Sequence, residues 1–116
     1  MQYLDPLDLR FIGPGQFQHL REFRCLPEDG SMLTVPAGRF TDGASTPKII
    51  WPVMSPWGSW TPAAALHDWL YREAIVPRDR ADALFLEGML SSGTDPAVAR
   101  TMYRGVRLFG SRSYQG

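Results

Sequence analysis

A breaker-rich segment at residues 41–60 divides this sequence into two parts that must fold differently. The segment contains Pro47, Pro52, Pro56, Gly43 and Gly58. Prolines and glycines at this density exclude a long helix or strand. Between them stand three tryptophans, which predict a packed loop because such large apolar rings are seldom left in water. Two interpretations stay open, a lid over the domain's own core or a partner-binding surface, and both depend on Trp51, Trp57 and Trp60.

The part before this segment has the composition of β-strands. Residues 16–26 (QFQHLREFRCL) and 32–40 (MLTVPAGRF) are rich in aromatic and apolar residues, and the turn-forming sequence PEDGS at 27–31 separates them. This turn chemistry predicts a β-hairpin. An earlier strand is expected near Asp8–Ile12, where Gly-Pro-Gly ends it. A small antiparallel N-terminal sheet is therefore predicted.

The part after the segment predicts three helices, at about 61–73, 79–91 and 95–110. Each begins with a residue pattern typical of a helix start, namely Thr61–Pro62, Asp79 and Asp95–Pro96. The predicted fold class is α+β, in which the small sheet is followed by three packed helices. The chain of 116 residues is expected to be a single domain. Its four parts are a β region (1–40), the loop (41–60), a helical region (61–110) and a tail (111–116).

Composition excludes several classes of function. Apolar residues make up 44% of the chain, but no run approaches the ~20 apolar residues of a membrane helix. Net charge is zero, which argues against general nucleic-acid binding because that binding needs excess positive charge. Cys25 stands alone, which excludes an internal disulfide or a cysteine-based zinc site, and we expect it to be an inert core or edge residue. The acidic start MQYLDPLDLR does not resemble a secretory signal, so synthesis in the cytoplasm is expected.

A histidine and several carboxylates form the first candidate site. His67 and Tyr71 are four residues apart, on the same helix face as Leu66 and Leu70, and Asp68 borders this face. On the next helix Asp82 shares a face with apolar residues, which is costly unless the carboxylate has a partner. The two helices should pack antiparallel across a short connection, so His67 and Asp82 can meet. The loop TDGAST adds Thr41, Asp42 and Ser45.

Three hypotheses for this set stay open. In the first, the polar groups form a buried structural network of Thr41, Asp42, Ser45, His67, Tyr71 and Asp82. In the second, His67 and one or two carboxylates bind a divalent metal, although a single histidine with oxygen ligands does not identify the ion. In the third, the chain is a hydrolase whose catalytic residues come from His67, Asp68, Asp42, Asp82 and Ser45. No nucleophile-elbow glycine pattern surrounds the serine, so the sequence leaves enzyme activity undecided, and no cofactor other than a metal is indicated.

Arginines on the third helix form the second candidate site. The apolar face of this helix is predicted to contain Val98, Met102, Val106 and Phe109, and another face contains Arg100, Arg104 and Arg107. No acid follows Asp95 in the chain. Eleven of the twelve basic residues are arginines, a residue type favoured at interfaces. These arginines indicate either a solvated basic face or a docking surface for an acidic partner.

Four stretches of the sequence, in order, resemble a family of small uncharacterised phage and prophage proteins. They are VPAGRFTDGASTPK (35–48), AALHDWLYR (64–72), RADALFLEGM (80–89) and RTMYRGVRLFG (100–110). The family shares a Thr-Asp-x-Ala-Ser-x-Pro loop, a His-Asp-x-Leu-Tyr helix, an Ala-Asp pair and a Met-Tyr-x-x-Val-Arg-x-Phe-Gly helix. Its marked positions correspond here to Thr41, Asp42, Ala44, Ser45, Pro47, His67, Asp68, Tyr71, Asp82, Tyr103 and Gly110. Gly43 departs from the family, where an apolar residue is common.

The resemblance implies a phage or prophage origin but no activity. Combined with the arginines and the tryptophan loop, it favours a virion-associated accessory component of a tail, baseplate or neck, bound to other phage structural proteins or to itself. One alternative is a phage hydrolase directed at the cell wall. A third is an intracellular phage protein that binds a host factor. We expect synthesis in the host cytoplasm, incorporation into the virion if the protein is structural, and no membrane span.

Overall fold

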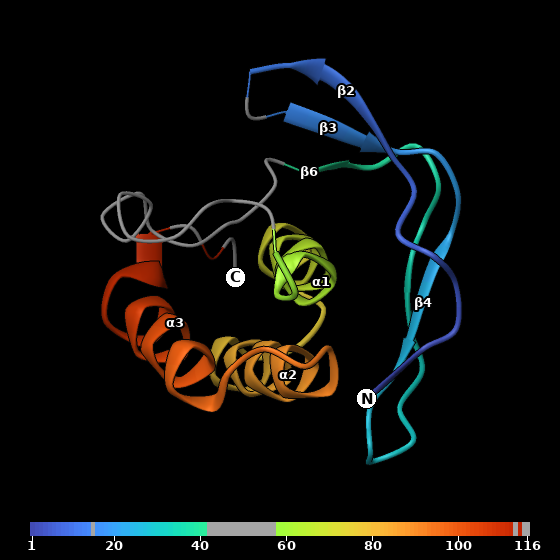
Figure 1. Cartoon of the computed structure of the whole chain (residues 1–116). Helices are drawn as coiled ribbons and strands as arrows, with labels where there is room; N and C mark the ends of the chain where they lie inside the picture. Colours follow the sequence, from blue (N-terminus) through green and yellow to red (C-terminus); the bar gives the residue numbers. More distant parts are fainter. Residues whose placement is uncertain (15, 42–57, 113, 115–116) are drawn as a thin grey trace.

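The structure is α+β, as the sequence predicts. The computed structural model describes residues 1–14, 16–41, 58–112 and 114. In this part of the chain six strands form two three-stranded antiparallel sheets, and three α-helices follow. Figure 1 shows α1 between the strands and the other two helices. The strands are β1 (Gln2–Tyr3), β2 (Leu9–Gly13), β3 (Gln16–His19), β4 (Phe23–Leu26), β5 (Leu33–Val35) and β6 (Phe40–Thr41).

The predicted hairpin around residues 27–31 is confirmed. Strands β4 and β5 pair antiparallel, with Cys25 opposite Leu33, and Gly30 takes a positive φ of 82° in the turn between them. The predicted first strand is also confirmed as β2, with Phe11 opposite Phe17 on β3. The sheet orders are β1-β4-β5 and β2-β3-β6.

One expected strand is divided in two. Residues 16–26 form β3 and β4, which belong to different sheets, so the single strand expected there is wrong. The chain leaves the β2-β3-β6 sheet after His19 and enters the β1-β4-β5 sheet at Phe23, because one straight strand cannot pair with both sets of neighbours. Between them Leu20 is 53% exposed, whereas Phe23 is 1% exposed.

The helices lie close to the predicted ranges, at α1 (Thr61–Glu73), α2 (Arg78–Ser91) and α3 (Pro96–Phe109). Asp95 caps α3 as expected, because its side chain accepts hydrogen bonds from the backbone N–H groups of Ala97 and Val98. The other two expected caps are wrong. Trp60 precedes α1, and Thr61 instead accepts a hydrogen bond from the Gly58 N–H through its side-chain oxygen. Proline precedes α2 and places Asp79 inside the first turn.

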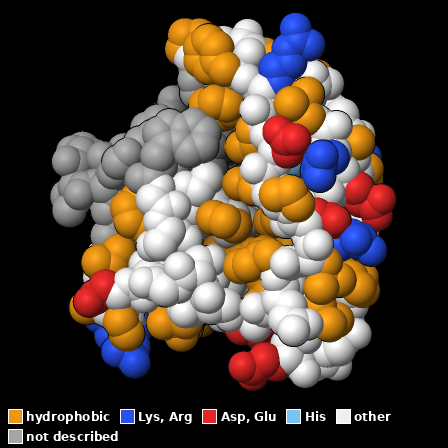
Figure 2. All heavy atoms as spheres, turned by 45° about the vertical axis from the view of Figure 1, so that its right-hand side comes forward, with side chains coloured by type: hydrophobic (Ala, Val, Ile, Leu, Met, Phe, Trp, Pro, Cys, Tyr) orange, Lys and Arg blue, Asp and Glu red, His pale blue; other side chains and the backbone are white. Residues whose placement is uncertain are grey.

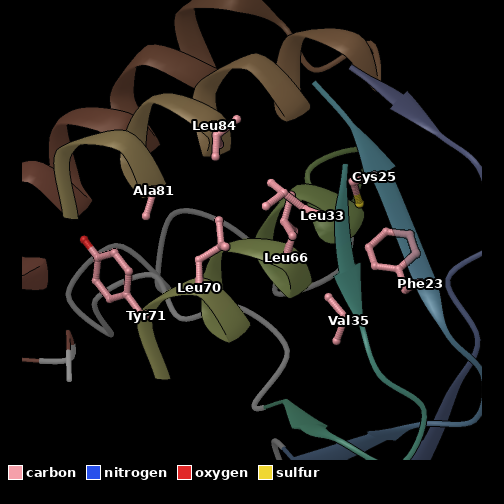
Figure 3. Close-up of a cluster of buried hydrophobic side chains, with 9 residues drawn as sticks. All are labelled: Phe23, Cys25, Leu33, Val35, Leu66, Leu70, Tyr71, Ala81 and Leu84. Atoms are coloured by element: carbon pink, nitrogen blue, oxygen red, sulfur yellow. The ribbon is translucent and has the colours of Figure 1, made fainter. Parts of the chain in front are cut away.

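The main core joins one sheet to two helices (Figure 3). Strands β4 and β5 contribute Phe23, Cys25, Leu33 and Val35, and α1 contributes Leu66, Leu70 and Tyr71, while α2 supplies Ala81 and Leu84. Cys25 is fully buried, and this burial raises the pKa of its thiol to about 12. The expected core position of Cys25 is therefore confirmed, and a protonated buried thiol is a poor nucleophile.

A second core cluster lies among the three helices. It consists of Ala63, Ala64, Phe85, Met89, Ala99, Met102 and Val106. The predicted apolar face of α3 is correct for Met102 and Val106, but Phe109 is 51% exposed. Phe109 is the last residue of α3, beyond the part of the helix that packs on this cluster.

No helix in the described ranges is long and apolar enough to cross a membrane. Figure 2 shows hydrophobic side chains at the upper end of the molecule and charged side chains of both signs along the strand side. The exposed apolar residues Phe11 (65%) and Phe40 (56%) belong to the β2-β3-β6 sheet.

Candidate functional site

His67 and Asp82 meet where α1 packs on α2, as the helix faces predict. The distance from His67 Nε2 to Asp82 Oδ1 is 2.7 Å. Both side chains are buried, with exposed fractions of 1% and 0%. The His67 ring also packs on Tyr71 and Phe85, with centroid distances of 4.1 and 4.7 Å. The histidine is therefore fixed by ring packing and by one buried hydrogen bond.

Asp82 is the centre of the network. Its Oδ1 accepts hydrogen bonds from His67 and from the Tyr71 hydroxyl, at 2.7 and 2.5 Å. Its Oδ2 accepts a hydrogen bond from Arg107 Nη1 at 2.7 Å. Both carboxylate oxygens are thus occupied by donors from the same chain, which offsets the cost of burying a charge.

The charge state of Asp82 follows from these donors. Burial by itself raises the pKa of this carboxyl, but the hydrogen bonds from His67, Tyr71 and Arg107 outweigh it and hold the pKa below its usual value. At neutral pH the carboxylate is ionised and can only accept hydrogen bonds. His67 Nε2 must therefore carry the proton that it donates to Asp82.

Two arginines extend the network to α3. Arg107 pairs with Asp82, and Arg78 donates through its Nη2 to the backbone oxygens of Val106 and Arg107, each at 2.7 Å. Arg78 Nε also donates to the Tyr71 hydroxyl at 3.2 Å. These bonds connect α1 and the start of α2 to the last turn of α3, where a cation also compensates the negative end of the helix dipole.

Tyr71 connects the network to the end of the chain. Burial raises the pKa of its hydroxyl well above the usual value, and the hydrogen bond to Asp82 adds to this effect. The ring packs edge-on against Tyr114, whose hydroxyl donates to the Val76 carbonyl at 2.7 Å. A Cβ at Gly110 would lie 2.8 Å from the Tyr71 hydroxyl oxygen. Glycine is thus required at this close approach.

The other predicted members of the first site have mixed outcomes. Asp68 is buried and accepts a hydrogen bond from Arg72 Nε at 3.1 Å. Thr41 is buried at the end of β6. Asp42 and Ser45 lie outside the described residues.

The structure places the three arginines of the second predicted site in two different environments. Arg100 and Arg104 are exposed, and neither forms an ion pair with the residues that the structure describes. Arg107 differs from the expected array because its guanidinium turns inward to Asp82. Trp60 is half-buried and packs against the second core cluster. Trp51 and Trp57 lie outside the described part of the chain.

Sequence reasoning missed the internal roles of Arg78 and Arg107. Arg78 stands four residues before Asp82, a spacing that places two oppositely charged side chains on one helix face, so this signal was present. Arg107 had no such local signal, because its partner is 25 residues away. Only the packing of α3 on α2 identifies that pair.

A metal site finds no support within the described ranges, where no group of three or more histidine, cysteine or acidic side chains is placed to hold an ion. Within the described part of the network, the histidine and carboxylate that suit a metal are His67 and Asp82, and they are hydrogen-bonded to each other.

The fold and site define a small α+β domain with a buried, fully hydrogen-bonded carboxylate between its helices. The chain belongs to the family described as "Protein of unknown function (DUF1353)", whose model matches residues 17–106. It is 35% identical over 74 residues to the uncharacterized protein y4iH of Sinorhizobium fredii (strain NBRC 101917 / NGR234). That match covers 62% of this chain and 31% of the relative, so the chain spans about a third of the relative's length. No solved structure matches the chain.

Proposed function

We propose that this protein is a virion-associated accessory component of a phage tail, baseplate or neck, and that it acts by docking onto other proteins. The observation that supports this proposal is the outer face of α3. Arg100 and Arg104 are exposed to solvent on this face. No aspartate or glutamate follows them in the sequence. Leu108 is 73% exposed on the same helix. Exposed arginines, which can pair with carboxylates through two hydrogen bonds, beside an exposed apolar residue are a combination that protein interfaces use.

The buried network favours docking over catalysis. A general base must reach its substrate, whereas His67 is 1% exposed and both oxygens of Asp82 are occupied by His67, Tyr71 and Arg107. We assign the network the role of fastening the three helices together. Such a fastening keeps the outer face of α3 in a fixed position relative to the sheets.

Mass spectrometry of purified particles from the source phage tests the proposal. The wild-type chain should be present at a constant ratio to the known structural proteins. A variant with Arg100→Glu and Arg104→Glu should fold normally but be missing from particles. Arg10→Glu is the matched control, because Arg10 is exposed on β2 and forms no ion pair among the described residues. Absence of the wild-type protein from particles, although it is abundant in infected cells, would contradict the proposal and favour an intracellular role with a host factor.

A cell-wall hydrolase is the second candidate, and one observation favours it. The 2.7 Å bond between His67 and Asp82 orients an imidazole as catalytic carboxylates do. This candidate predicts that purified protein releases soluble fragments from isolated cell walls, and that His67→Gln abolishes the release. A metal-dependent version predicts a higher melting temperature with Zn, Mn, Mg or Ca. No release and no thermal shift would leave only the docking role.

A further inference from the structure

The β2-β3-β6 sheet is held to the rest of the molecule differently from the β1-β4-β5 sheet. Its strand β6 contacts α1, whereas α2 and α3 lie farther away (Figure 1). Among the residues that the structure describes, β2, β3 and β6 contribute no side chain to either hydrophobic core cluster. The described side chains of these strands that are fully buried are polar, namely His19 and Thr41, whereas Phe11 and Phe40 are mostly exposed. This sheet therefore lacks the apolar anchor that fixes β4 and β5 to the helices.

His19 lies where this sheet meets the other one. Its ring stacks on Phe23 of β4, with a centroid distance of 6.1 Å. Its backbone N–H donates to the Arg39 carbonyl and its carbonyl accepts from the Gly38 N–H, each at 2.8 Å. Arg39 also pairs with Glu73 of α1 at 2.9 Å, but the two side chains are 50% and 34% exposed, so water weakens this link. The stacking of His19 on Phe23 is thus a buried link between the sheet and the rest of the fold.

The surroundings of the His19 ring favour its neutral form. The residue is 2% exposed, and neither ring nitrogen has a hydrogen-bond partner among the described residues. Burial lowers the pKa of His19, and the negative charge of Asp68 on α1 opposes this shift only in part. Asp68 itself accepts a hydrogen bond from Arg72. Phe23 on β4 and Leu9, which lies opposite His19 on β2, carry no charge. Protonation would therefore place a poorly solvated charge in this junction, which is costly.

We propose that His19 is a pH-sensitive switch that releases the β2-β3-β6 sheet from the rest of the fold in mildly acidic solution. In the released state the imidazole reaches water and binds a proton as readily as an ordinary histidine, near pH 6.5. Below that pH the ratio of released to closed molecules rises by up to about tenfold per pH unit, since release takes up one proton. Strands this short are not stable without packing against another element, so release should also open the backbone hydrogen bonds within the sheet. This switch does not depend on the docking face of α3.

Amide hydrogen exchange followed by NMR between pH 7.5 and pH 5 tests the proposal on the whole chain. Protection factors, which correct for the intrinsic pH dependence of exchange, should fall several-fold for the His19 and Leu20 amides as the pH decreases. At pH 5 both amides should be at least about tenfold less protected than the Leu70 amide inside α1, because the sheet opens while the helices stay folded. Binding of the dye ANS should increase over the same range, since release uncovers Phe23, which is 1% exposed in the closed form.

A variant that cannot be protonated at this position separates the switch from other effects of acid. His19→Met leaves His67 as the only histidine of the chain, and it should abolish the fall in Leu20 protection. His19→Gln serves the same purpose if the methionine variant does not fold, and an NMR titration of the wild-type His19 ring should give a pKa below 6.5. Three results would overturn the proposal. They are a ring that titrates at or above pH 6.5, a Leu20 amide as well protected as that of Leu70 at pH 5, and an unchanged pH response in the folded variant.

Discussion

Two regions that contain arginines from the same helix differ completely in what surrounds them. Arg107 lies in a closed network in which Asp82 is 0% exposed and accepts three hydrogen bonds. Arg104 and Arg100, about one and two turns earlier on the helix, face solvent. The pairing of Arg107 with a buried carboxylate thus distinguishes it from the two arginines that the sequence spacing groups with it. A buried charge is retained only with its partners satisfied, whereas an exposed charge is free to serve recognition.

The largest effect should come from removing the centre of the network. Asp82→Ala leaves Arg107, His67 and Tyr71 without their common acceptor, and we expect a loss of about 3–5 kcal/mol of unfolding free energy. Urea unfolding followed by circular dichroism measures it. Asp79→Ala is the matched control on the same helix, because Asp79 is exposed in the first turn, and it should cost about 1 kcal/mol or less. A similar cost for both variants would show that the network contributes little.

A smaller effect is expected for His67→Ala, at about 1–3 kcal/mol, because Asp82 keeps its bonds to Tyr71 and Arg107. In the Asp82→Ala background the same change should cost clearly less, since the hydrogen bond is already lost. Equal costs in both backgrounds would mean that His67 stabilises the fold through ring packing alone. An unchanged melting temperature would contradict its place in the network.

The smallest effect concerns His19, a buried histidine outside the network. Burial lowers its pKa below the usual 6.5, and the negative charge of Asp68 on α1 opposes this shift only in part. Neither ring nitrogen has a hydrogen-bond partner among the described residues. The unfolded chain therefore binds the proton more tightly, so this contribution to stability is complete above pH 6.5 and is lost as the pH falls below it.

Replacing His19 with methionine should remove that part of the pH dependence. Melting temperatures of His19→Met and wild type, measured between pH 7.5 and pH 5, should diverge as the pH falls, with the variant the more stable at acidic pH. Parallel curves would contradict a buried neutral His19. The ionised Asp82 produces a separate loss of stability at lower pH, because its lowered pKa makes the unfolded chain the stronger proton binder there.

Local signals predicted much of this architecture. The turn at residues 27–31, the Asp95 cap and the shared helix faces of His67 and Asp82 each depend on residues close in sequence or on one helix period. The division of residues 16–26 between two sheets was missed, because strand composition does not specify which neighbours a strand pairs with. The inward turn of Arg107 was missed for a related reason. Periodicity places Arg100, Arg104 and Arg107 on one side of α3, but the position of Asp82 on α2 decides which of them forms an internal ion pair.

The melting temperatures of Arg107→Gln and Arg104→Gln test the contrast between the two regions most directly. Both variants make the same chemical change on the same helix, three residues apart. Arg107→Gln should lower the melting temperature by about 4–8 °C for each kcal/mol lost from the pair with Asp82, whereas Arg104→Gln should leave it within about 2 °C of wild type. Equal shifts for the two variants, or a larger shift for Arg104→Gln, would contradict the division of α3 into an arginine that fastens the helices and arginines that face solvent.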